Sequence, residues 1–252
     1  MQIIAIANQK GGVGKSTLAV HLAWLALEQE RPVLLVDMDG QANSSRTFTD
    51  EFTGVLASKL FTEAPGTLKG SPQAISDQFS LIPADMAIND VEGLELETIE
   101  RPAAHIRALP LTAETLVIID TPPTLGRRLL SALIAADAVV SPVALNGYSI
   151  QGITDLQKTI QTVMRRFNPR LKNLGLLANM VNSRSATHAQ MLGELRQVLG
   201  DKLLSVTLGH RVAISDAIDR GRPVWQGTRG ESAQRAAQEM RGVCTAILEK
   251  LS

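Results

Sequence analysis

Residues 10–17, which read KGGVGKST, have the types and spacing of a loop that binds phosphate groups. The loop joins an apolar run at residues 3–7, suited to a buried parallel strand, to a helical pattern at residues 18–27. Glycines let backbone N–H groups converge on phosphate oxygens in front of the positive end of a helix. Lys15 would then meet the β- and γ-phosphates and Ser16 would ligate Mg²⁺, whereas the alternative is an ordinary glycine-rich turn. We therefore predict a nucleotide site made by Lys10, Gly11, Gly12, Val13, Gly14, Lys15, Ser16 and Thr17.

Carboxylates end two further apolar runs. Residues 32–37 read as a buried strand that leads into Asp37 and Asp39, and residues 116–120 (LVIID) end in Asp120. Carboxylates at strand ends beside a phosphate loop can contact the Mg²⁺ shell or orient an attacking water, although Asp is also a common turn former. The run ending in Asp120 matches the Walker B pattern, in which the carboxylate contacts the Mg²⁺ shell. Asp120 is therefore a predicted metal and nucleotide residue.

The nucleotide is expected to be ATP, bound together with Mg²⁺. Guanine-specific proteins with such a loop carry an N-K-x-D segment, and the sequence contains none. Asn179, in a later apolar run, could read the adenine edge or could be a buried structural amide. The four histidines are scattered, and a single cysteine, Cys244, excludes an internal disulfide and a metal cluster built from cysteines.

Strands and helices that would position these residues alternate along the chain. Apolar runs predict strands at residues 3–7, 32–37, 79–83, 116–120, 138–143, 174–181 and 203–208. Helical patterns cover residues 18–27, 127–136, 149–167, 214–219 and 231–251. This order predicts an α/β fold: a doubly wound, mostly parallel sheet with helices on both faces, in one domain over residues 1–252. Within the less informative residues 44–115 we expect a short helix at 53–61 and an exposed, acidic helix at 90–109.

Composition limits the class of protein. Of the 252 residues 44% are hydrophobic and 3% aromatic, enough for a sizeable core of Ala, Leu, Ile and Val. No run of about 18 apolar residues predicts a membrane helix, and no signal peptide precedes the first strand. We expect a cytosolic protein.

Charge is divided unevenly along the chain. Residues 1–159 carry 11 Lys and Arg against 18 Asp and Glu, residues 160–252 carry 14 against 7, and the net charge is zero. A basic C-terminal part is typical of contact with a polyanion such as nucleic acid. Arginines in expected loops or at helix ends can reach phosphates, or they can form structural salt bridges. The candidate DNA-binding residues are Arg184, Arg211, Arg220, Arg222 and Arg229.

Position 10 holds lysine where the standard loop G-x-x-x-x-G-K-[ST] begins with glycine. The loop thereby resembles the deviant Walker A motif of the ParA/MinD family of P-loop ATPases. Residues 37–43 resemble the D-x-D-P-Q-G-N segment of ParA proteins, from which only Gly40 and Ala42 depart. Residues 57–61 (ASKLF) and 223–225 (PVW) look most like the IncC branch of that family, and the resemblance covers nearly the whole chain.

The resemblance implies roles for particular residues. Lys10 would reach across a dimer to the nucleotide of the partner, and Asp39 would take the hydrolytic role. Gly40, where the family has proline, would leave the Asp39 loop more flexible. Arg229 best matches a DNA-contacting arginine of the family. The expected catalytic residues are Lys10, Lys15 and Asp39, and the expected metal residues are Ser16, Asp39 and Asp120.

The resemblance also implies an ATP-dependent DNA partition ATPase. ATP-bound monomers would pair face to face, bind DNA without sequence preference, and be released when a ParB-type centromere-binding protein stimulates hydrolysis. The expected partners are therefore a second copy of the chain, nonspecific DNA and a ParB-type protein, in the cytoplasm and on the nucleoid. No basic amphipathic tail follows the last helical pattern, so membrane binding of the MinD type is not expected. No helix-turn-helix precedes the first strand, so we do not expect operator binding.

Two alternatives stay open. The same machinery could position another cargo, such as chemoreceptor clusters or carboxysomes. A metabolic enzyme, such as a dethiobiotin-synthetase-like carboxylase or an amidoligase, would instead need a shaped small-molecule pocket and would turn over without DNA or a protein partner.

Overall fold

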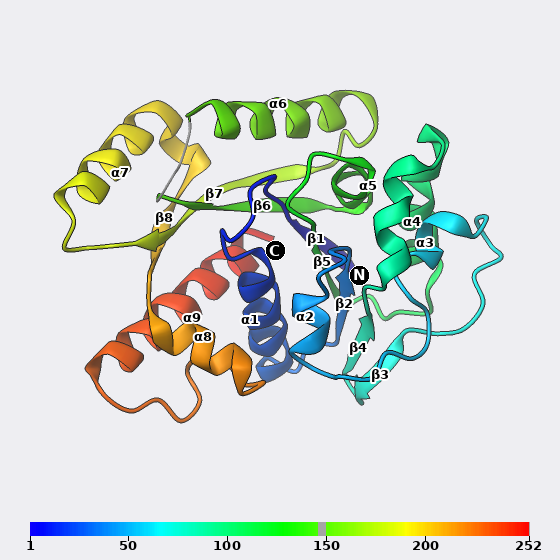
Figure 1. The fold of residues 1–252 in the computed structure, drawn as a ribbon, viewed down its shortest axis with the longest axis horizontal. Helices are drawn as coiled ribbons and strands as arrows, with labels where there is room; N and C mark the ends of the chain where they lie inside the picture. The colour runs from blue at the N-terminus through cyan, green and yellow to red at the C-terminus, as the bar shows by residue number, and fades with distance from the viewer. Residues whose placement is uncertain (146–149, 252) are drawn as a thin grey trace.

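The computed structural model of the protein describes residues 1–145 and 150–251 (Figure 1). The strands are β1 (Gln2–Ile6), β2 (Val33–Asp37), β3 (Gln73–Ser76), β4 (Phe79–Ile82), β5 (Leu116–Asp120), β6 (Ala138–Ala144), β7 (Lys172–Val181) and β8 (Leu203–Gly209). The α-helices are α1 (Lys15–Glu28), α2 (Asn43–Arg46), α3 (Lys59–Thr62), α4 (Arg101–Ala108), α5 (Arg127–Ala135), α6 (Ile150–Arg166), α7 (Ala186–Leu199), α8 (Val212–Asp219) and α9 (Glu231–Leu251). Shorter 3₁₀ helices are η1 (Met86–Gly93), η2 (Leu96–Glu100) and η3 (Gly200–Lys202).

The described strands form one doubly wound sheet. Its order is β3-β4-β2-β5-β1-β6-β7-β8; β3 is antiparallel to β4, and the other neighbouring strands are parallel. The order reverses around β1, which lies between β5 and β6, and the carboxyl ends of β1, β2 and β5 therefore meet at one edge. Open α/β sheets bind ligands at that edge. The predicted fold class is confirmed.

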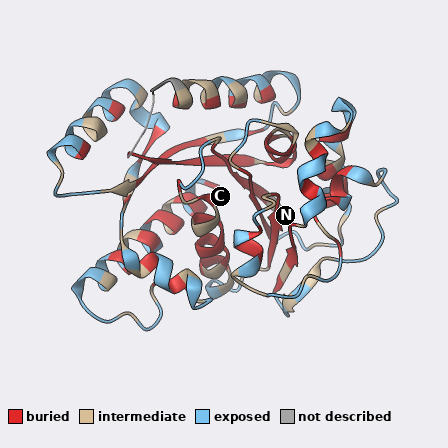
Figure 2. Ribbon diagram, viewed as in Figure 1, coloured by how far each residue is buried: buried red, intermediate tan, exposed pale blue. Residues whose placement is uncertain are grey.

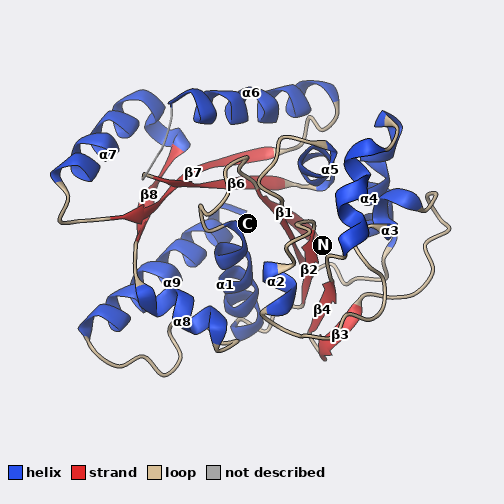
Figure 3. Ribbon diagram, viewed as in Figure 1, coloured by secondary structure: helices blue, strands red, loops and turns tan. Residues whose placement is uncertain are grey.

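Helices cover both faces of the sheet, as Figures 2 and 3 show. Along β1, Ile4 and Ile6 pack in a cluster with α1, α8 and α9, whereas Ile3 and Ala5 pack in a second cluster with α5 and α6. A third cluster joins α6 and α7 to β7 and β8. Because most of these strands are buried on both faces, they appear in the sequence as continuous apolar runs.

Residues 44–115 depart most from expectation. The helix predicted at 53–61 is reduced to α3, and the single exposed helix predicted at 90–109 was wrong, because the chain forms η1, η2 and α4 there. Gly93 ends η1, Pro102 lies in the first turn of α4, and the Ile99 and Ile106 side chains are buried. The antiparallel edge strand β3 was not predicted, because its four residues alternate between half-buried and exposed and give a weak apolar signal.

The remaining predicted elements appear within a few residues of their expected bounds. The helix predicted from residue 149 begins at Ile150, and position 149 itself lies outside the described residues. Within the described ranges no helix is both long and apolar enough to cross a membrane. Cys244 is buried as a free thiol in the cluster between α9 and the sheet.

Candidate nucleotide-binding site

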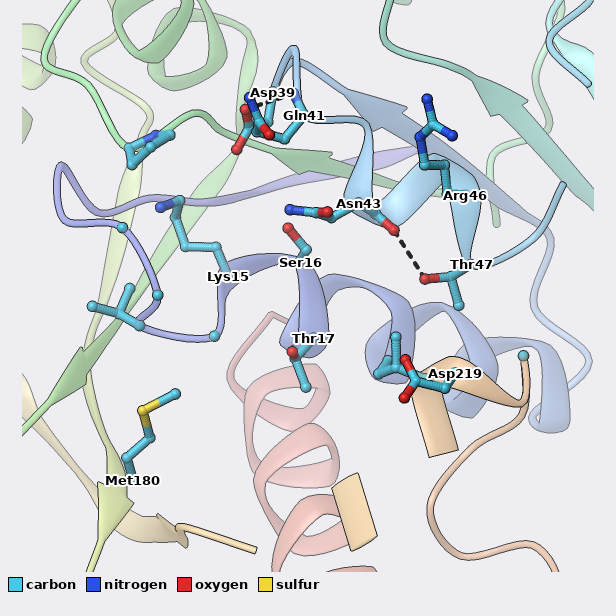
Figure 4. Close-up of a pocket in the computed structure, with 17 residues that line it drawn as sticks. Lys15, Ser16, Thr17, Asp39, Gln41, Asn43, Arg46, Thr47, Met180 and Asp219 are labelled. Carbon is cyan, nitrogen blue, oxygen red and sulfur yellow. Dashed lines mark hydrogen bonds between the residues drawn. The ribbon is translucent and has the colours of Figure 1, made fainter. Parts of the chain in front are cut away.

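A cavity of about 730 Å³ lies at the edge of the sheet where β1, β2 and β5 end. The predicted phosphate loop forms one wall of it, and the segment after β2 forms another. In Figure 4 the side chains of Lys15, Ser16 and Asn43 point toward the same space. The cavity is lined by Gly11, Gly12, Val13, Gly14, Lys15, Ser16, Thr17, Asp39, Gln41, Asn43, Arg46, Thr47, Pro123, Met180, Ile218, Asp219 and Gly221.

The phosphate loop is held from behind by Asn179 of β7. Its amide Nδ2 donates to the Val13 carbonyl at 2.7 Å, and its Oδ1 accepts from the Met180 N–H at 2.7 Å. Gly14 precedes α1 with φ of 87°, and a Cβ atom there would lie 2.4 Å from the same Nδ2. Glycine is therefore required at position 14 both for its backbone conformation and for the approach of Asn179. Both ends of the buried amide are engaged, which favours the structural alternative for Asn179 over adenine reading.

Lys15 is buried with its ammonium group inside the loop. Its Nζ donates to the Lys10 carbonyl at 3.0 Å, and the N–H of Lys10 in turn donates to Asn8 Oδ1 at 2.9 Å. Burial lowers the pKa of Lys15, and the Asp120 and Asp39 carboxylates oppose that shift. A partly desolvated cation in a glycine-rich loop at the start of α1 is suited to receive phosphate oxygens.

The neighbouring carboxylates Asp37 and Asp120 have different environments, although both are fully buried. Asp37 accepts from the Ser45 N–H and hydroxyl at 3.0 and 2.7 Å and from the Asp39 N–H at 3.0 Å. Asp37 therefore fixes the turn that carries Asp39 and the start of α2. Neither oxygen of Asp120 has a hydrogen bond of ordinary geometry within the described residues.

Burial and a second carboxylate set the electrostatics of Asp120. Burial, and then the Asp37 carboxylate, raise the pKa of Asp120 to about 7, while the nearby Ser16 and Ser44 hydroxyls and the Lys15 ammonium lower it. A buried carboxylate with unused oxygens beside a serine hydroxyl fits the shell of Mg²⁺, which takes hard oxygen ligands and keeps several waters. The described residues hold no group of three His, Cys, Asp or Glu side chains that would bind a metal alone. Ser16 and Asp120 therefore fit an Mg²⁺ ion that phosphate oxygens and waters help to hold.

Asp39 lines the cavity from the turn after β2. Its Oδ1 accepts from the Gln41 N–H at 3.1 Å, and its carbonyl accepts from the Ala42 N–H at 2.8 Å. Ala42 has φ of 55°, a left-handed conformation, which explains why glycine suits this position in the ParA segment. Met180, on the opposite wall, also has φ of 55°. Non-glycine residues in this region are uncommon and tend to gather at functional sites.

Several lining residues were not predicted. Gln41 and Asn43 belong to the same motif as Asp39, so the motif itself could have indicated them. Arg46 ends α2 and Thr47 follows it, and the Thr47 hydroxyl donates to the Asn43 carbonyl at 3.0 Å (Figure 4). Pro123, Met180, Ile218, Asp219 and Gly221 come from segments that only the fold brings to the cavity.

The five candidate DNA-binding arginines separate into three groups. Arg211 forms a two-point ion pair with Glu239 of α9, through Nε at 2.9 Å and through Nη2. Arg184 is exposed just before α7. Arg220, Arg222 and Arg229 line a second cavity of about 520 Å³ beside α8, and none of them has an ion pair in the described part of the chain.

A glycine-rich loop between β1 and α1, with a buried carboxylate at the end of β5, defines a P-loop nucleotide-binding protein. Comparisons with known proteins narrow this class. A family described as an AAA domain matches residues 1–173. Protein IncC of Escherichia coli is 38% identical over 257 aligned residues, covering 100% of this chain and 70% of the relative. The chromosome-partitioning ATPase Soj of Thermus thermophilus is 35% identical, covering 88% of this chain and 87% of the relative.

The chain belongs to the ParA/MinD family of P-loop ATPases. A solved structure of cobyrinic acid a,c-diamide synthase from Mycobacterium smegmatis, with bound ATP analogue and magnesium, is 25% identical with a TM-score of 0.76. The match covers 99% of this chain and 95% of that one. The ligands in that structure agree with the prediction of ATP and Mg²⁺ as cofactors.

Proposed function

We propose that this protein is an ATP-dependent DNA partition ATPase whose ATP-bound dimer binds DNA and is released on hydrolysis. The proposal is carried by one observation: the Lys15 loop and the Asp39 turn line the same cavity, in a chain related to IncC and Soj. The first wall binds phosphates, and the second wall presents a carboxylate to them.

In the wall of that cavity and directly behind it, each residue has a proposed task. The backbone N–H groups of the loop and the Lys15 ammonium hold the β- and γ-phosphates at the positive end of α1. The Ser16 hydroxyl and the Asp120 carboxylate would hold Mg²⁺, which supplies neutralisation of the charge that develops on the phosphates. Asp39 accepts a hydrogen bond from the attacking water and so orients it toward the γ-phosphate. Asp37 keeps the Asp39 turn in place through the Asp39 N–H.

Dimerisation is proposed to occur across the phosphate loop. Lys10 is exposed on the loop, where a second copy of the chain facing it would bring the partner's nucleotide within reach. Gly12 is also exposed and has φ of 69°, with no atom within 4 Å of the place a Cβ would occupy. A valine at position 12 would therefore strain the loop backbone of the monomer itself, so Lys10 is the better position for testing dimerisation.

DNA binding is proposed to use the arginine-lined cavity. Arg220, Arg222 and Arg229 come together there without ion-pair partners among the described residues, so their charges are available to phosphate groups. Arg184 would add an exposed charge next to α7. Arg211 has a structural role instead, because its guanidinium is engaged by Glu239. Binding of this kind would place the protein on the nucleoid, where a ParB-type partner would stimulate hydrolysis.

Two other functions remain as competitors. Positioning of a different cargo would use the same two cavities. An ATP-dependent amidoligase is the second candidate, because the cobyrinic acid a,c-diamide synthase matches the fold with a TM-score of 0.76 over 99% of this chain. An amidoligase would hydrolyse ATP only together with its small-molecule substrate and would have no need of DNA.

A binding assay on a random-sequence duplex, with ADP, ATP or a non-hydrolysable ATP analogue, tests the proposal. We expect affinity with ATP and with the analogue, little with ADP, and no dependence on DNA sequence. Absence of DNA binding with ATP and with the analogue would overturn the partition function and favour the amidoligase. If the protein bound DNA but no ParB-type protein stimulated its ATP hydrolysis, positioning of another cargo would be favoured.

A further inference from the structure

A buried arginine outside the nucleotide cavity connects the two loops that face the nucleotide. Arg128, the second residue of α5, has 6% of its surface exposed. Its Nη1 donates to the Met38 carbonyl at 3.3 Å and to Asn89 Oδ1 at 3.2 Å, and its Nε donates to Glu92 Oε1 at 2.9 Å. One guanidinium thus joins the turn after β2, the helix η1 and the start of α5.

Glu92 extends this connection to the loop that follows Asp120. Its second oxygen, Oε2, accepts from the Arg127 N–H at 2.7 Å. A Cβ atom at Gly126 would lie 2.2 Å from the same oxygen, so the carboxylate can approach the loop only because position 126 is glycine. This loop, residues 121–126, includes Pro123 in the wall of the nucleotide cavity.

Asn89 packs against Gly40, the residue after Asp39. A Cβ atom at position 40 would lie 2.4 Å from Asn89 Oδ1 and 2.6 Å from its Nδ2. The side chain of Asn89 therefore occupies the space that any larger residue at position 40 would need. The flexibility expected from glycine at this position is offset by a side chain from η1.

We propose that Arg128, Glu92 and Asn89 are positioning residues that hold the Asp39 carboxylate in its place relative to the loop after Asp120. The inference rests on the proposed role of Asp39 in hydrolysis. The Met38 N–H donates to the Asp120 carbonyl at 2.9 Å, so the turn is fixed on its inner side by β5 and on its outer side by Arg128. A shift of about 1 Å in a catalytic group can cost on the order of a hundredfold in rate.

The geometry separates this role from nucleotide binding. None of the three side chains lines the cavity, so their loss should change the turnover number rather than the affinity for ATP. Arg107 of α4, whose side chain is more exposed than that of Arg128, offers a control for the type of contact, because its Nη2 donates to the Asp137 carboxylate at 2.7 Å and to the Ala135 carbonyl at 3.0 Å. That pair has the same chemistry as the Arg128 contacts and touches neither loop.

The test is steady-state and single-turnover ATP hydrolysis by Arg128→Lys, Asn89→Ala and Arg107→Lys, with thermal unfolding of each. Lysine keeps the charge but lacks the planar fork that reaches several acceptors. We expect kcat to fall about tenfold in Arg128→Lys and less in Asn89→Ala, with KM for ATP within about twofold of the wild type. Arg107→Lys should keep the wild-type kcat.

A double-mutant cycle gives a readout that lost stability would not. Gly40→Ala alone forces a methyl group onto Asn89 and should lower kcat, whereas Gly40→Ala with Asn89→Ala removes the clash. The double variant should therefore be faster than the product of the two single effects predicts. Asn89 is exposed, so its replacement by alanine should fold even where Arg128→Lys does not.

Four results would each overturn the positioning role. The first two are an unchanged kcat in both Arg128→Lys and Asn89→Ala, and an equal loss of kcat in Arg107→Lys. The others are a rise in KM without a fall in kcat, and a double-mutant cycle whose effects are additive. Asp39→Ala, measured in parallel, separates this failure from failure of the proposed function. If the wild type hydrolyses ATP and Asp39→Ala does not, the results for Arg128→Lys, Asn89→Ala and the cycle decide the inference alone. If Asp39→Ala is as fast as the wild type, the role of Asp39 falls and the positioning role falls with it.

Discussion

The two cavities on either side of α8 differ in how their polar groups are held. At the nucleotide cavity, Lys15 in its wall and Asp37 behind the Asp39 turn are buried, and both side chains form hydrogen bonds with backbone groups. In the arginine-lined cavity, Arg220 and Arg229 are exposed, and neither forms an ion pair within the described ranges. The first arrangement selects one ligand geometry, whereas the second attracts negative charge without specifying its arrangement.

The largest effect is expected in the nucleotide cavity. Lys15→Ala should weaken MgATP binding about 1,000-fold, because two phosphate groups lose a charge-assisted contact that contributes roughly 1.5 to 3 kcal/mol each. Titration with a fluorescent ATP analogue measures the affinity. Arg229→Glu, in the other cavity, serves as the control and should bind the analogue as the wild type does. Wild-type affinity in Lys15→Ala would remove the loop from the nucleotide site.

Hydrolysis should depend on Asp39 more than binding does. Asp39→Ala should bind ATP within a few-fold of the wild type but hydrolyse it about 100-fold more slowly, as expected when a group that orients or accepts a proton from water is removed. Single-turnover measurements separate chemistry from release. A variant that turns over at the wild-type rate would show that Asp39 only shapes the turn.

The difference between the cavities also explains how far the sequence could predict them. Lys15, Ser16 and Asp120 belong to continuous segments in which a strand and the loop after it fix the geometry. The motifs and their neighbours therefore sufficed to place these residues at one edge of the sheet, while their roles stay predictions. Asn179 was recognised as a polar residue in a strand, but its contact with Val13 depends on the pairing of β7 with β6 and β6 with β1. Local patterns do not encode such contacts.

The basic surface was predicted only as an average over many residues. Net charge indicated that arginines after residue 159 would face a polyanion, but it could not show that Arg211 is engaged by Glu239, 28 positions away. The contacts of Arg128 were missed for the same reason, because they join α5 to η1 and to the turn after β2. The fold class could be predicted from the order of the apolar runs alone, because that order does not depend on any single residue.

A buried histidine links the two cavities and gives a pH-dependent test. His21 Nδ1 donates to the Thr17 carbonyl at 2.7 Å, and its Nε2 accepts from the Val224 N–H at 3.3 Å. Thr17 lines the nucleotide cavity and Val224 the arginine-lined one. Burial lowers the pKa of His21 from 6.5 to about 4, with the Thr17 carbonyl opposing the shift. Protonation of Nε2 would also place two N–H donors against each other, because the Val224 N–H already points at this atom.

The sign of the pH effect follows from that shift. Between about pH 6.5 and 4 the unfolded state binds a proton at His21 and the folded state does not. The stability that neutral His21 gives the folded state is therefore fully present above pH 6.5 and is lost as the pH falls toward 4. We expect the free energy of unfolding to fall by about 2 kcal/mol between pH 7 and 5 from this group alone. Denaturant unfolding of the wild type and His21→Gln measures the difference. The exposed His210→Gln is the control, and equal pH slopes in all three proteins would contradict the prediction.

The smallest effect is expected in the arginine-lined cavity, because several weak contacts share the binding there. Arg229→Glu should lower DNA affinity about tenfold in the ATP state, since one phosphate contact is lost on each protomer of the proposed dimer. The slope of log affinity against log salt should fall by about 2, at roughly 0.9 per phosphate neutralised. Fluorescence anisotropy with a labelled duplex at several salt concentrations measures both quantities. Arg211→Gln gives the contrast: it should lower stability by leaving Glu239 without its partner, yet change the salt slope little. If Arg211→Gln altered the slope and Arg229→Glu did not, the DNA surface would lie beside α9 and the arginine-lined cavity would have no part in it.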